Sequence, residues 1–294
     1  MSFYTAFYFH PFKFHKHNYN LRRDKLEKEY LKLLQKIYTY GHDTGDRTET
    51  GMRSLFGETM EFNMSEGFPL VTTKKMFTRG VFGELLWFLS GSTSNTELEE
   101  KYGIKFWKEW ANEAGQLPNI YGKQWTRWED GRGNIFNQIK YVIDQIKNNP
   151  TSRRILFTGW NAPEMQWKDT ALPCCHSTVV QFYVDGEYLH MYHYQRSGDM
   201  FLGVPVNIAS YATLLTMIAQ QCELKPGVMK HTVGVAHIYH NHLNQVKEQL
   251  TRSPYQAPKL NIKRKPESIF DYSLEDFKVI DYVHHPLIKG DVAI

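Results

Sequence analysis

The stretch YQRSGDMFLGVPVNIASY spans residues 194–211 and joins a polar segment to an apolar one. Arg196 and Ser197 stand side by side in the polar half, and the apolar half continues as a helical pattern from Asn207 to Gln221. Guanidinium, hydroxyl and backbone N–H donors all suit phosphate oxygens, particularly where a loop leads into a helix. The stretch therefore predicts an anion-binding turn at the start of a helix, although an Arg-Ser pair alone is a weak signal.

Periodicity on either side of this stretch predicts a mixture of helices and strands. Residues 26–37 and 135–146 show helical spacing of apolar side chains, and residues 81–89 form an apolar helix interrupted by Glu84. Strands are expected at residues 56–64, 155–160, 178–184 and 188–194. Because neither a repeat nor a linker separates these elements, we expect one α+β domain at residues 22–294, with a mainly antiparallel or mixed β-sheet flanked by helices.

Residues 1–21 precede this domain as an extension rich in aromatic residues and histidine. The extension lacks an aliphatic core and a small-residue cleavage site, so it does not resemble a signal peptide. Scattered aromatic residues have no defined chemistry of their own. We therefore expect the extension to pack on the surface or to serve in assembly.

The bulk composition is that of an ordinary globular protein of 294 residues, with 41% hydrophobic and 22% charged residues. The net charge of +4 is smaller than a dedicated nucleic-acid-binding protein usually carries, whereas it suits small anionic substrates. No run approaches the roughly 18 apolar residues of a membrane span. The composition therefore predicts neither a DNA partner nor a membrane partner.

Two of the three cysteines are adjacent, in the segment LPCCH at residues 172–176. An odd number with an adjacent pair is a poor disulfide framework, which favours a reducing compartment such as the cytoplasm. The spacing also lacks the paired ligands of a structural zinc site, so no metal is expected. A cysteine protease would need a histidine from elsewhere in the chain, whereas a buried, unreactive thiol is the usual fate of a free cysteine. The segment alone favours the buried, unreactive thiol.

Further motifs occur in the order in which the thymidylate synthase family has them, and the chain resembles that family over residues 22–294. Besides residues 194–211 and the Cys175-His176 pair, the motifs are FPLVTTKK at 68–75, ELLWFL at 84–89, IYGKQW at 120–125, Arg153-Arg154, AHIY at 236–239 and residues 288–294. The resemblance implies reductive methylation of C5 of dUMP to dTMP, with 5,10-methylenetetrahydrofolate as cosubstrate. It also implies a homodimer and no metal.

The resemblance assigns catalytic roles to Cys175, Glu84, Tyr121, His176 and Asn207. Cys175 would add as a thiolate to C6 of the pyrimidine, which makes C5 nucleophilic toward the one-carbon unit. Glu84 would act as acid and base, since burial among apolar neighbours raises the pKa of a carboxyl toward neutrality. Tyr121 would assist removal of the C5 proton. Asn207 would offer an acceptor to N3–H of uracil and a donor to O4, a pattern that cytosine does not match.

The phosphate of the nucleotide would be held by residues of both subunits of the dimer. Within one subunit the resemblance assigns it to Arg47, Arg196 and Ser197. Two adjacent arginines, Arg153 and Arg154, would reach across from the second subunit. Two adjacent arginines are ordinarily a solvated surface pair, so this role follows from the resemblance and not from the pair itself.

The resemblance also assigns residues to the 3′-hydroxyl and to the folate. His237 and Tyr239 would bind the 3′-hydroxyl of the nucleotide. The folate would contact two tryptophans, a carboxylate, a lysine near its carboxylate tail and the last residue of the chain: Trp107, Trp110, Asp199, Lys74 and Ile294.

The chain departs from the family pattern near the expected pocket. Cys174 stands where the family has proline, Val179 and Val180 where it has aromatic residues, Val206 where it has phenylalanine, and Val235 where it has aspartate. Smaller side chains admit water, which keeps open a related reaction, the phage-type hydroxymethylation of dUMP. A non-catalytic relative that binds nucleotides or RNA is a third hypothesis, but such a binder would not need a thiol nucleophile. An enzyme encoded by a phage would work in the cytoplasm of its host.

Overall fold

A six-stranded sheet is the centre of the fold in the computed structural model, which describes residues 25–45, 49–164 and 174–292. Its strands are β1 (His42–Thr44), β2 (Met52–Asn63), β5 (Leu156–Phe157), β6 (Val179–Asp185), β7 (Tyr188–Asp199) and β8 (Lys225–Tyr239). They lie in the order β1-β2-β8-β7-β6-β5, and every neighbouring pair is antiparallel except β7 and β8. The prediction of an α+β fold with a mainly antiparallel, mixed sheet is confirmed.

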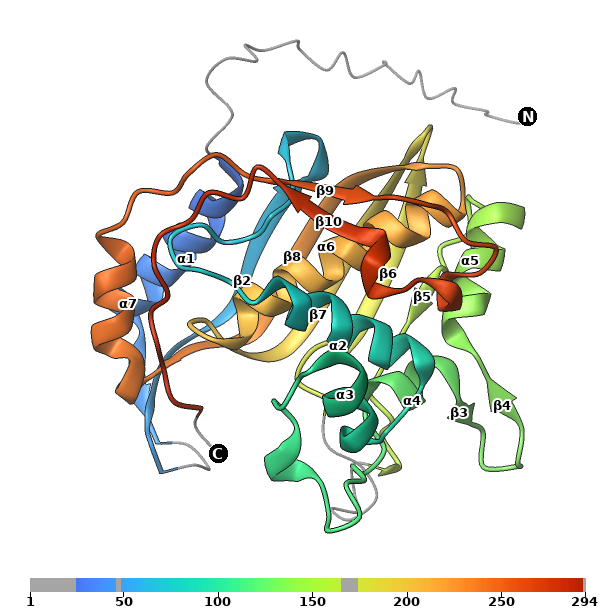
Figure 1. The fold of residues 1–294 in the computed structure, drawn as a ribbon, viewed down its shortest axis with the longest axis horizontal. Helices are drawn as coiled ribbons and strands as arrows, with labels where there is room; N and C mark the ends of the chain where they lie inside the picture. Colours follow the sequence, from blue (N-terminus) through green and yellow to red (C-terminus); the bar gives the residue numbers. More distant parts are fainter. Residues whose placement is uncertain (1–24, 46–48, 165–173, 293–294) are drawn as a thin grey trace, which may run out of the picture.

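The helices gather on one face of this sheet (Figure 1). They are α1 (Lys25–Tyr40), α2 (Thr78–Ser90), α3 (Asn95–Tyr102), α4 (Tyr121–Thr126), α5 (Gln138–Asn148), α6 (Gly203–Gln221) and α7 (Leu243–Leu250). Helix α6 packs on β7 and β8, α1 packs on β2, and α2 packs on α6. The remaining elements are the hairpins β3 (Trp128–Glu129) with β4 (Ile135–Phe136) and β9 (Lys259–Ile262) with β10 (Phe277–Ile280), and the 3-10 turns η2 (Met64–Glu66), η3 (Lys108–Trp110), η5 (His240–His242), η6 (Ile269–Asp271) and η7 (Leu274–Asp276).

Helix α6 is the crossover between β7 and β8, since two parallel strands cannot be joined by a tight turn. The helix is apolar around most of its circumference and is almost entirely buried, as expected for a helix enclosed between a sheet and other helices. Residues 194–211 therefore comprise the end of β7, a short turn and the beginning of α6. The arrangement matches the turn and helix that the sequence predicted, with the helix beginning at Gly203.

Side chains alternate across the sheet between the covered face and the opposite face. In β6, Val180 and Phe182 are buried against the helices, whereas Tyr183 is 65% exposed. Phe56 in β2 and Tyr192 in β7 are also exposed. Within the described ranges, no helix lies over the face that carries these aromatic side chains (Figure 1).

Two helix boundaries test the sequence pattern. Helix α1 ends at Tyr40, and the N–H of the next residue, Gly41, donates to Ile37 O at 2.9 Å. The helix expected from residue 135 instead begins at Gln138, because Asn137 caps it through a side chain that accepts from the backbone of the first turn. Ile135 lies in β4, so its apparent helical phase was coincidental.

The strand expected at residues 155–160 is limited to the two residues of β5. Thr158 N donates to Gln138 Oε1 at 3.0 Å, and Gly159 N donates to Ser177 O at 2.7 Å. These backbone groups bond to a helix and a turn instead of to a neighbouring strand, so the ladder ends at Phe157.

A carboxylate in α1 holds the segment that carries the FPLVTTKK motif. Glu27 accepts hydrogen bonds from the backbone N–H of Thr72 (2.8 Å) and of Thr73 (2.9 Å), and from both of their hydroxyl groups. Thr72 and Thr73 are themselves buried, so these bonds satisfy donors that water cannot reach. The segment is thereby fixed to the helical layer.

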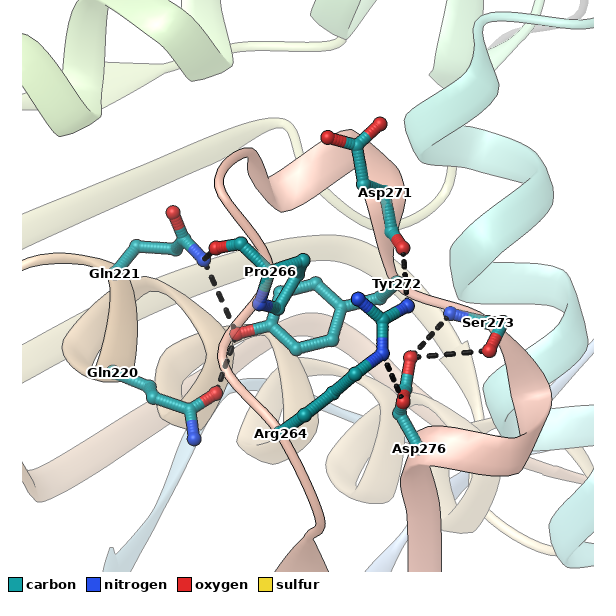
Figure 2. A network of polar contacts seen from close by, with 8 residues as sticks. All are labelled: Gln220, Gln221, Arg264, Pro266, Asp271, Tyr272, Ser273 and Asp276. Atoms are coloured by element: carbon teal, nitrogen blue, oxygen red, sulfur yellow. Dashed lines mark hydrogen bonds and ion pairs between the residues drawn. The ribbon is translucent and has the colours of Figure 1, made fainter.

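The C-terminal hairpin is anchored by a separate polar network, shown in Figure 2. Tyr272 OH donates to Gln220 Oε1 at 2.5 Å, and Gln221 Nε2 lies 3.4 Å from the same hydroxyl, which ties the connection after β9 to the end of α6. Arg264 Nε donates to Asp276 Oδ1 at 2.7 Å. The contacts of Tyr272 join residues 52 and 51 positions apart and hold the β9–β10 connection against α6, whereas the bond between Arg264 and Asp276 lies within that connection.

Candidate active site

Cys175 lies in the turn that precedes β6, and its backbone is held from two sides. Its carbonyl oxygen accepts a hydrogen bond from Arg196 N in β7 (2.7 Å), and its N–H donates to the hydroxyl oxygen of Tyr121 in α4 (2.9 Å). The side chain of Cys175 is exposed, whereas Cys174 is 2% exposed. Of the two adjacent thiols, the structure presents to a ligand the one that the resemblance assigns as the nucleophile.

The guanidinium of Arg196 places a positive charge beside this sulfur. Arg196 Nη2 lies 3.6 Å from Cys175 Sγ, and Arg196 Nε donates to Cys174 O at 3.3 Å. The guanidinium also lies over the ring of Trp160, 5.7 Å from its centroid. The guanidinium is thus within contact distance of the sulfur that would attack carbon. Ser197, the second predicted phosphate ligand of this strand, follows directly and is half-buried.

The neighbouring thiol is held in an unreactive state. Burial raises the pKa of Cys174 to about 12, and the Cys175 sulfur adds to this effect while Arg196 opposes it. A thiol with such a pKa stays protonated at neutral pH and is a poor nucleophile. The two cysteines therefore differ in chemistry although they are adjacent in sequence.

Glu84 is a buried carboxyl in the middle of α2. It is 6% exposed, and Trp107 Nε1 donates to its Oε1 at 2.8 Å. Burial raises the pKa of Glu84 to about 7, and the hydrogen bond from Trp107 only partly offsets that effect. A carboxyl with this pKa can both take up and release a proton near neutral pH, which is what general acid–base catalysis needs. The apolar neighbours in the sequence predicted this environment.

Aromatic rings connect Glu84 with the cysteine turn. Trp107 lies 5.9 Å from Tyr121 between ring centroids, and Tyr121 stacks on His176 at 4.0 Å with an interplanar angle of 5°. His176 Nδ1 lies 2.7 Å from the hydroxyl of Tyr211. Burial lowers the pKa of His176 to about 3, so its imidazole is neutral at neutral pH. Burial raises the pKa of Tyr121 well above its ordinary value, so its hydroxyl keeps its proton.

Asn207 lies in the first turns of α6 and is 7% exposed. Its Oδ1 accepts a hydrogen bond from Gln195 Nε2 at 3.1 Å. Gln195 is the residue before Arg196 in β7, so the amide of Asn207 is tied to the same strand that holds the cysteine turn. Asn207 is therefore placed at the point where the helix, the strand and the cysteine turn meet.

His237 and Tyr239 lie near the end of β8, beside the end of β7. Their ring centroids are 4.9 Å apart, and His237 pairs with Asp199 in the parallel ladder. Asp199 Oδ1 accepts a hydrogen bond from Phe201 N at 2.8 Å, which shapes the turn into α6. These three predicted ligands thus lie at the end of the sheet that also carries Arg196.

A hollow of about 550 Å³ opens beside the two predicted folate tryptophans. Trp110 lines it together with Phe106, Lys105 and Val292, and Trp107 lies 5.6 Å from Trp110 between ring centroids. The same wall carries one cation, Lys105, and two carboxylates, those of Glu109 and Asp291. Its aromatic rings suit a flat heterocycle. The C-terminal segment lies within reach of this hollow, since Val292 forms part of its wall.

Lys74 does not lie in this hollow. Its side chain is buried, its ammonium donates to the carbonyl oxygen of Phe201, and it lies 3.7 Å from the centroid of the Phe201 ring. Burial lowers the pKa of Lys74 to about 8, against an opposing effect of Asp199. The ammonium is therefore directed into the protein in this structure, and not toward the carboxylate tail of a folate.

The remaining predicted ligands are separate from this cluster. Arg153 and Arg154 are exposed beside β5, the strand at one edge of the sheet, where Gln181 Nε2 donates to Arg153 O at 3.2 Å. Arg47 and Ile294 lie outside the described residues.

Several polar residues of the site escaped the sequence analysis. Gln195, His193 and His231 are all buried on the covered face of the sheet, next to Tyr211 of α6. The alternation of side chains along β7 would have identified two of them, because Tyr192 is exposed whereas His193 and Gln195 are buried. A polar side chain in the buried phase of a strand needs a partner, which marks it as part of a network.

Two absences apply to residues 25–45, 49–164 and 174–292. No group of three or more histidine, cysteine, aspartate or glutamate side chains is placed there to hold a metal ion. None of the helices in these ranges combines the length and the apolar character that crossing a bilayer requires.

A buried carboxyl whose pKa is raised to about 7 and an exposed thiol beside a guanidinium are typical of catalytic sites. The family model described as thymidylate synthase matches residues 28–294. The chain belongs to the thymidylate synthase family, as its motifs predicted. Family membership makes it a one-carbon transferase, of a family that acts on dUMP with a reduced folate.

Proposed function

We propose that this enzyme converts dUMP to dTMP by reductive methylation with 5,10-methylenetetrahydrofolate. The observation that carries the proposal is the exposed Cys175 thiol, with Arg196 Nη2 at 3.6 Å from its sulfur. Glu84, whose pKa burial raises to about 7, supplies an acid–base group that Trp107 and Tyr121 connect to the cysteine turn. We place the reaction in a reducing compartment such as the cytoplasm, because the nucleophile must remain a thiol.

The nucleotide reacts through a covalent bond to the enzyme. Cys175 Sγ attacks C6 of uracil, and the electron pair of the C5–C6 double bond moves toward C5 and O4. Asn207 stabilises this enolate, since its amide donates to O4 and accepts from N3–H. C5 then forms a bond to the one-carbon unit and loses its proton, with Tyr121 and Glu84 as the nearby proton carriers. Loss of that proton breaks the bond between the one-carbon unit and the folate nitrogen and leaves an exocyclic methylene on C5. Hydride from the tetrahydrofolate reduces this methylene to a methyl group while Cys175 leaves C6 as a thiolate, which restores the C5–C6 double bond and yields dTMP and dihydrofolate.

Arg196 and Ser197 hold the phosphate, with Arg47 as a third ligand of the same subunit. Their donors suit phosphate oxygens, and their position in β7 sets the distance from the phosphate to the reacting ring. His237 and Tyr239 bind the 3′-hydroxyl from the neighbouring strand. His176 remains a neutral ring that supports the cysteine turn through its contacts with Tyr121 and Tyr211.

The folate occupies the hollow beside Trp107 and Trp110. Methylenetetrahydrofolate supplies the one-carbon unit and, in methylation, the hydride. Trp107 shields the reacting carbon from water, and the chain terminus with Ile294 closes over the folate. Asp199 lies at the same end of the sheet for a polar contact with the folate. Lys105 lines the hollow, so it suits the carboxylate tail better than the buried Lys74 does.

We also propose a homodimer in which the open face of the sheet is buried. Phe56 is 81% exposed and Tyr183 is 65% exposed on that face, which is unusual for large aromatic side chains of a monomer. Arg153 and Arg154 would reach the phosphate site of the second subunit. Mixing inactive Cys175→Ser protein with inactive Arg153→Ala protein should regenerate activity, because some mixed dimers contain one intact site. No recovery despite proven subunit exchange contradicts a shared site.

The product distinguishes the proposal from its alternative. Methylation releases dihydrofolate, which is measured by absorbance, and gives dTMP in a mass spectrum. If dUMP is consumed without dihydrofolate and the product is heavier than dTMP by one oxygen, the enzyme is a hydroxymethylase. If dUMP binds but no nucleotide is converted with any reduced folate, the protein is a non-catalytic relative.

A further inference from the structure

A line of buried amides and imidazoles runs behind Asn207. His231 Nε2 lies 2.9 Å from Gln195 Oε1, and Gln195 Nε2 donates to Asn207 Oδ1 at 3.1 Å. Gln195 Nε2 also donates to the carbonyl oxygen of Ser197 at 2.9 Å. His231 and Gln195 are 0% and 2% exposed, so water cannot substitute for a missing partner.

The direction of each hydrogen bond in this line follows from the Ser197 carbonyl. A backbone carbonyl can only accept, so the end of the Gln195 side chain that faces it must be the NH₂ group. The other end of Gln195 is then its carbonyl oxygen, which also can only accept. His231 must therefore carry a proton on Nε2 to donate to Gln195.

The same reasoning fixes the amide of Asn207. An unrestrained amide can turn by 180° and exchange its donor and its acceptor, and it would then read cytosine as well as uracil. The NH₂ group of Gln195 requires an acceptor opposite it, so it holds Asn207 with Oδ1 toward β7. A second lone pair of Oδ1 and the Nδ2 donor remain for N3–H and O4 of uracil.

The ring of His231 is itself held in place by stacking. His193 and His231 are paired across the parallel strands, with ring centroids 4.4 Å apart, and His193 stacks on Tyr211 at 3.6 Å. Ser177 N donates to His193 Nε2 at 3.3 Å. Burial lowers the pKa of His231 to about 3, so the ring is neutral and carries one proton. With that proton on Nε2, His231 donates to Gln195 Oε1 and has no second N–H to donate elsewhere.

We propose that His231 is a positioning residue that sets the preference of this enzyme for uracil over cytosine. It acts through Gln195 on Asn207 without touching the nucleotide. The inference rests on the proposed use of dUMP as substrate, and it adds the residue that keeps the base-reading amide from turning.

The first test needs no substitution in the network. In ¹⁵N-histidine-labelled protein, NMR should show His231 protonated on Nε2 and His193 on Nδ1, because Ser177 N occupies His193 Nε2. A His231 ring that is protonated on Nδ1 overturns the proposal. This result depends only on the free protein, so it stands whether or not dUMP is the substrate.

The second test compares kcat/KM for dUMP and for dCMP in matched variants. In His231→Phe the donor to Gln195 is lost, and the ratio of the two values should fall about ten- to hundredfold, as expected when a buried amide loses its partner. His231→Gln keeps a donor near the position of Nε2 and should restore most of the ratio. His193→Phe is the control, because it keeps an aromatic ring in the same stack and removes no bond to Gln195, and its ratio of the two values should match that of the wild type.

Two results distinguish a merely structural role from a positioning role. If His231→Phe lowers kcat/KM for both nucleotides equally, or leaves their ratio unchanged, His231 does not set the preference and the proposal is wrong. Where His231→Phe does not fold, the tautomer measurement and the His231→Gln ratio decide. If wild-type enzyme neither binds nor converts dUMP, the proposed function fails, and the tautomer still reports on the hydrogen-bond line.

Discussion

Glu84 and Asp276 are both buried carboxyls, but they lie in different parts of the molecule and have different partners. Asp276, at the C-terminal anchor of Figure 2, accepts from Ser273 N (2.8 Å), Ser273 Oγ (3.1 Å) and Arg264 Nε (2.7 Å). Among the described residues, Glu84 accepts one hydrogen bond, from Trp107. The Asp276 carboxyl thus accepts three hydrogen bonds, whereas the Glu84 carboxyl accepts one from the described residues.

The pKa values of the two groups follow from this difference. Burial acts to raise the pKa of Asp276, but the bonds from Ser273 and Arg264 outweigh it, and the pKa is lowered. At Glu84 burial is nearly unopposed and raises the pKa to about 7. A carboxyl that stabilises a fold is surrounded by donors, whereas one that must exchange protons is deprived of them. The comparison therefore separates a structural region from a catalytic one.

The largest expected effect in the catalytic region comes from Cys175→Ser. The variant should lose turnover of dUMP by about 10³-fold or more, because a serine hydroxyl does not ionise near neutral pH and cannot form the C6 adduct. Its melting temperature should stay close to that of the wild type, since the side chain is exposed. Steady-state turnover and a thermal melt measure the two quantities.

Cys174→Ser is the matched control for this prediction, because the residue is adjacent but buried. It should remain active and should lose some stability. An inactive Cys174→Ser protein beside an active Cys175→Ser protein would reverse the assignment of the nucleophile.

Glu84→Gln should lower kcat by about 10²- to 10⁴-fold, the usual contribution of a general acid–base group. The wild-type profile of kcat/KM against pH should contain an ionisation near 7, because Glu84 is protonated below that pH and ionised above it. That ionisation should be absent from the profile of Glu84→Gln. A profile that keeps the same ionisation assigns it to another group.

Glu84→Gln should raise the free energy of unfolding at high pH although it lowers kcat. The pKa of Glu84 is raised from 4.5 to about 7 on folding, so the stability it allows is complete below pH 4.5 and is lost as pH rises through about 7. At pH 8 the variant should be up to about 3 kcal/mol more stable than the wild type. At pH 4 the two should be equal, apart from effects of the amide itself. Urea unfolding at both pH values measures the difference.

Asp276→Asn should have the smallest of these effects, and it should act on stability alone. Loss of the charged acceptor for Arg264 and Ser273 should lower the free energy of unfolding by about 1–3 kcal/mol. Because the pKa of Asp276 is lowered on folding, its contribution is present above pH 3.8 and is lost as pH falls through the lowered value. A large loss of kcat with unchanged stability would contradict the separation of the two regions.

Local sequence patterns were sufficient for the parts of the site that depend on neighbouring residues. The apolar residues around Glu84 predicted its burial, and residues 194–211 predicted the turn into α6. The choice of Cys175 over Cys174 came from the family motif, and the exposure of the two thiols agrees with it.

Contacts between distant segments could not be predicted in this way. The bond between His231 and Gln195 joins residues 36 positions apart on two strands, and it depends on the register of the parallel pair. The ammonium of Lys74 donates to the carbonyl oxygen of Phe201, 127 positions away in the sequence, and therefore points into the protein. The sequence motif around Lys74 does not contain this contact, so the motif alone assigned Lys74 to the folate. The short β5 likewise reflects a hydrogen bond that the backbone N–H of Thr158 donates to the side chain of Gln138 in α5 instead of to a neighbouring strand.

The central claim is that Cys175 forms a covalent bond to C6 of a deoxyuridine nucleotide while the one-carbon unit is transferred. 5-Fluoro-dUMP tests it directly, because the fluorine at C5 cannot leave as the proton does, so the adduct accumulates. The protein is incubated with 5-fluoro-dUMP and methylenetetrahydrofolate, and its intact mass is measured before digestion and sequencing of the labelled peptide. We expect a mass increase equal to the nucleotide plus the folate, located on Cys175 and absent from Cys175→Ser. An unmodified protein, or a label on Cys174 or Cys222, would contradict it.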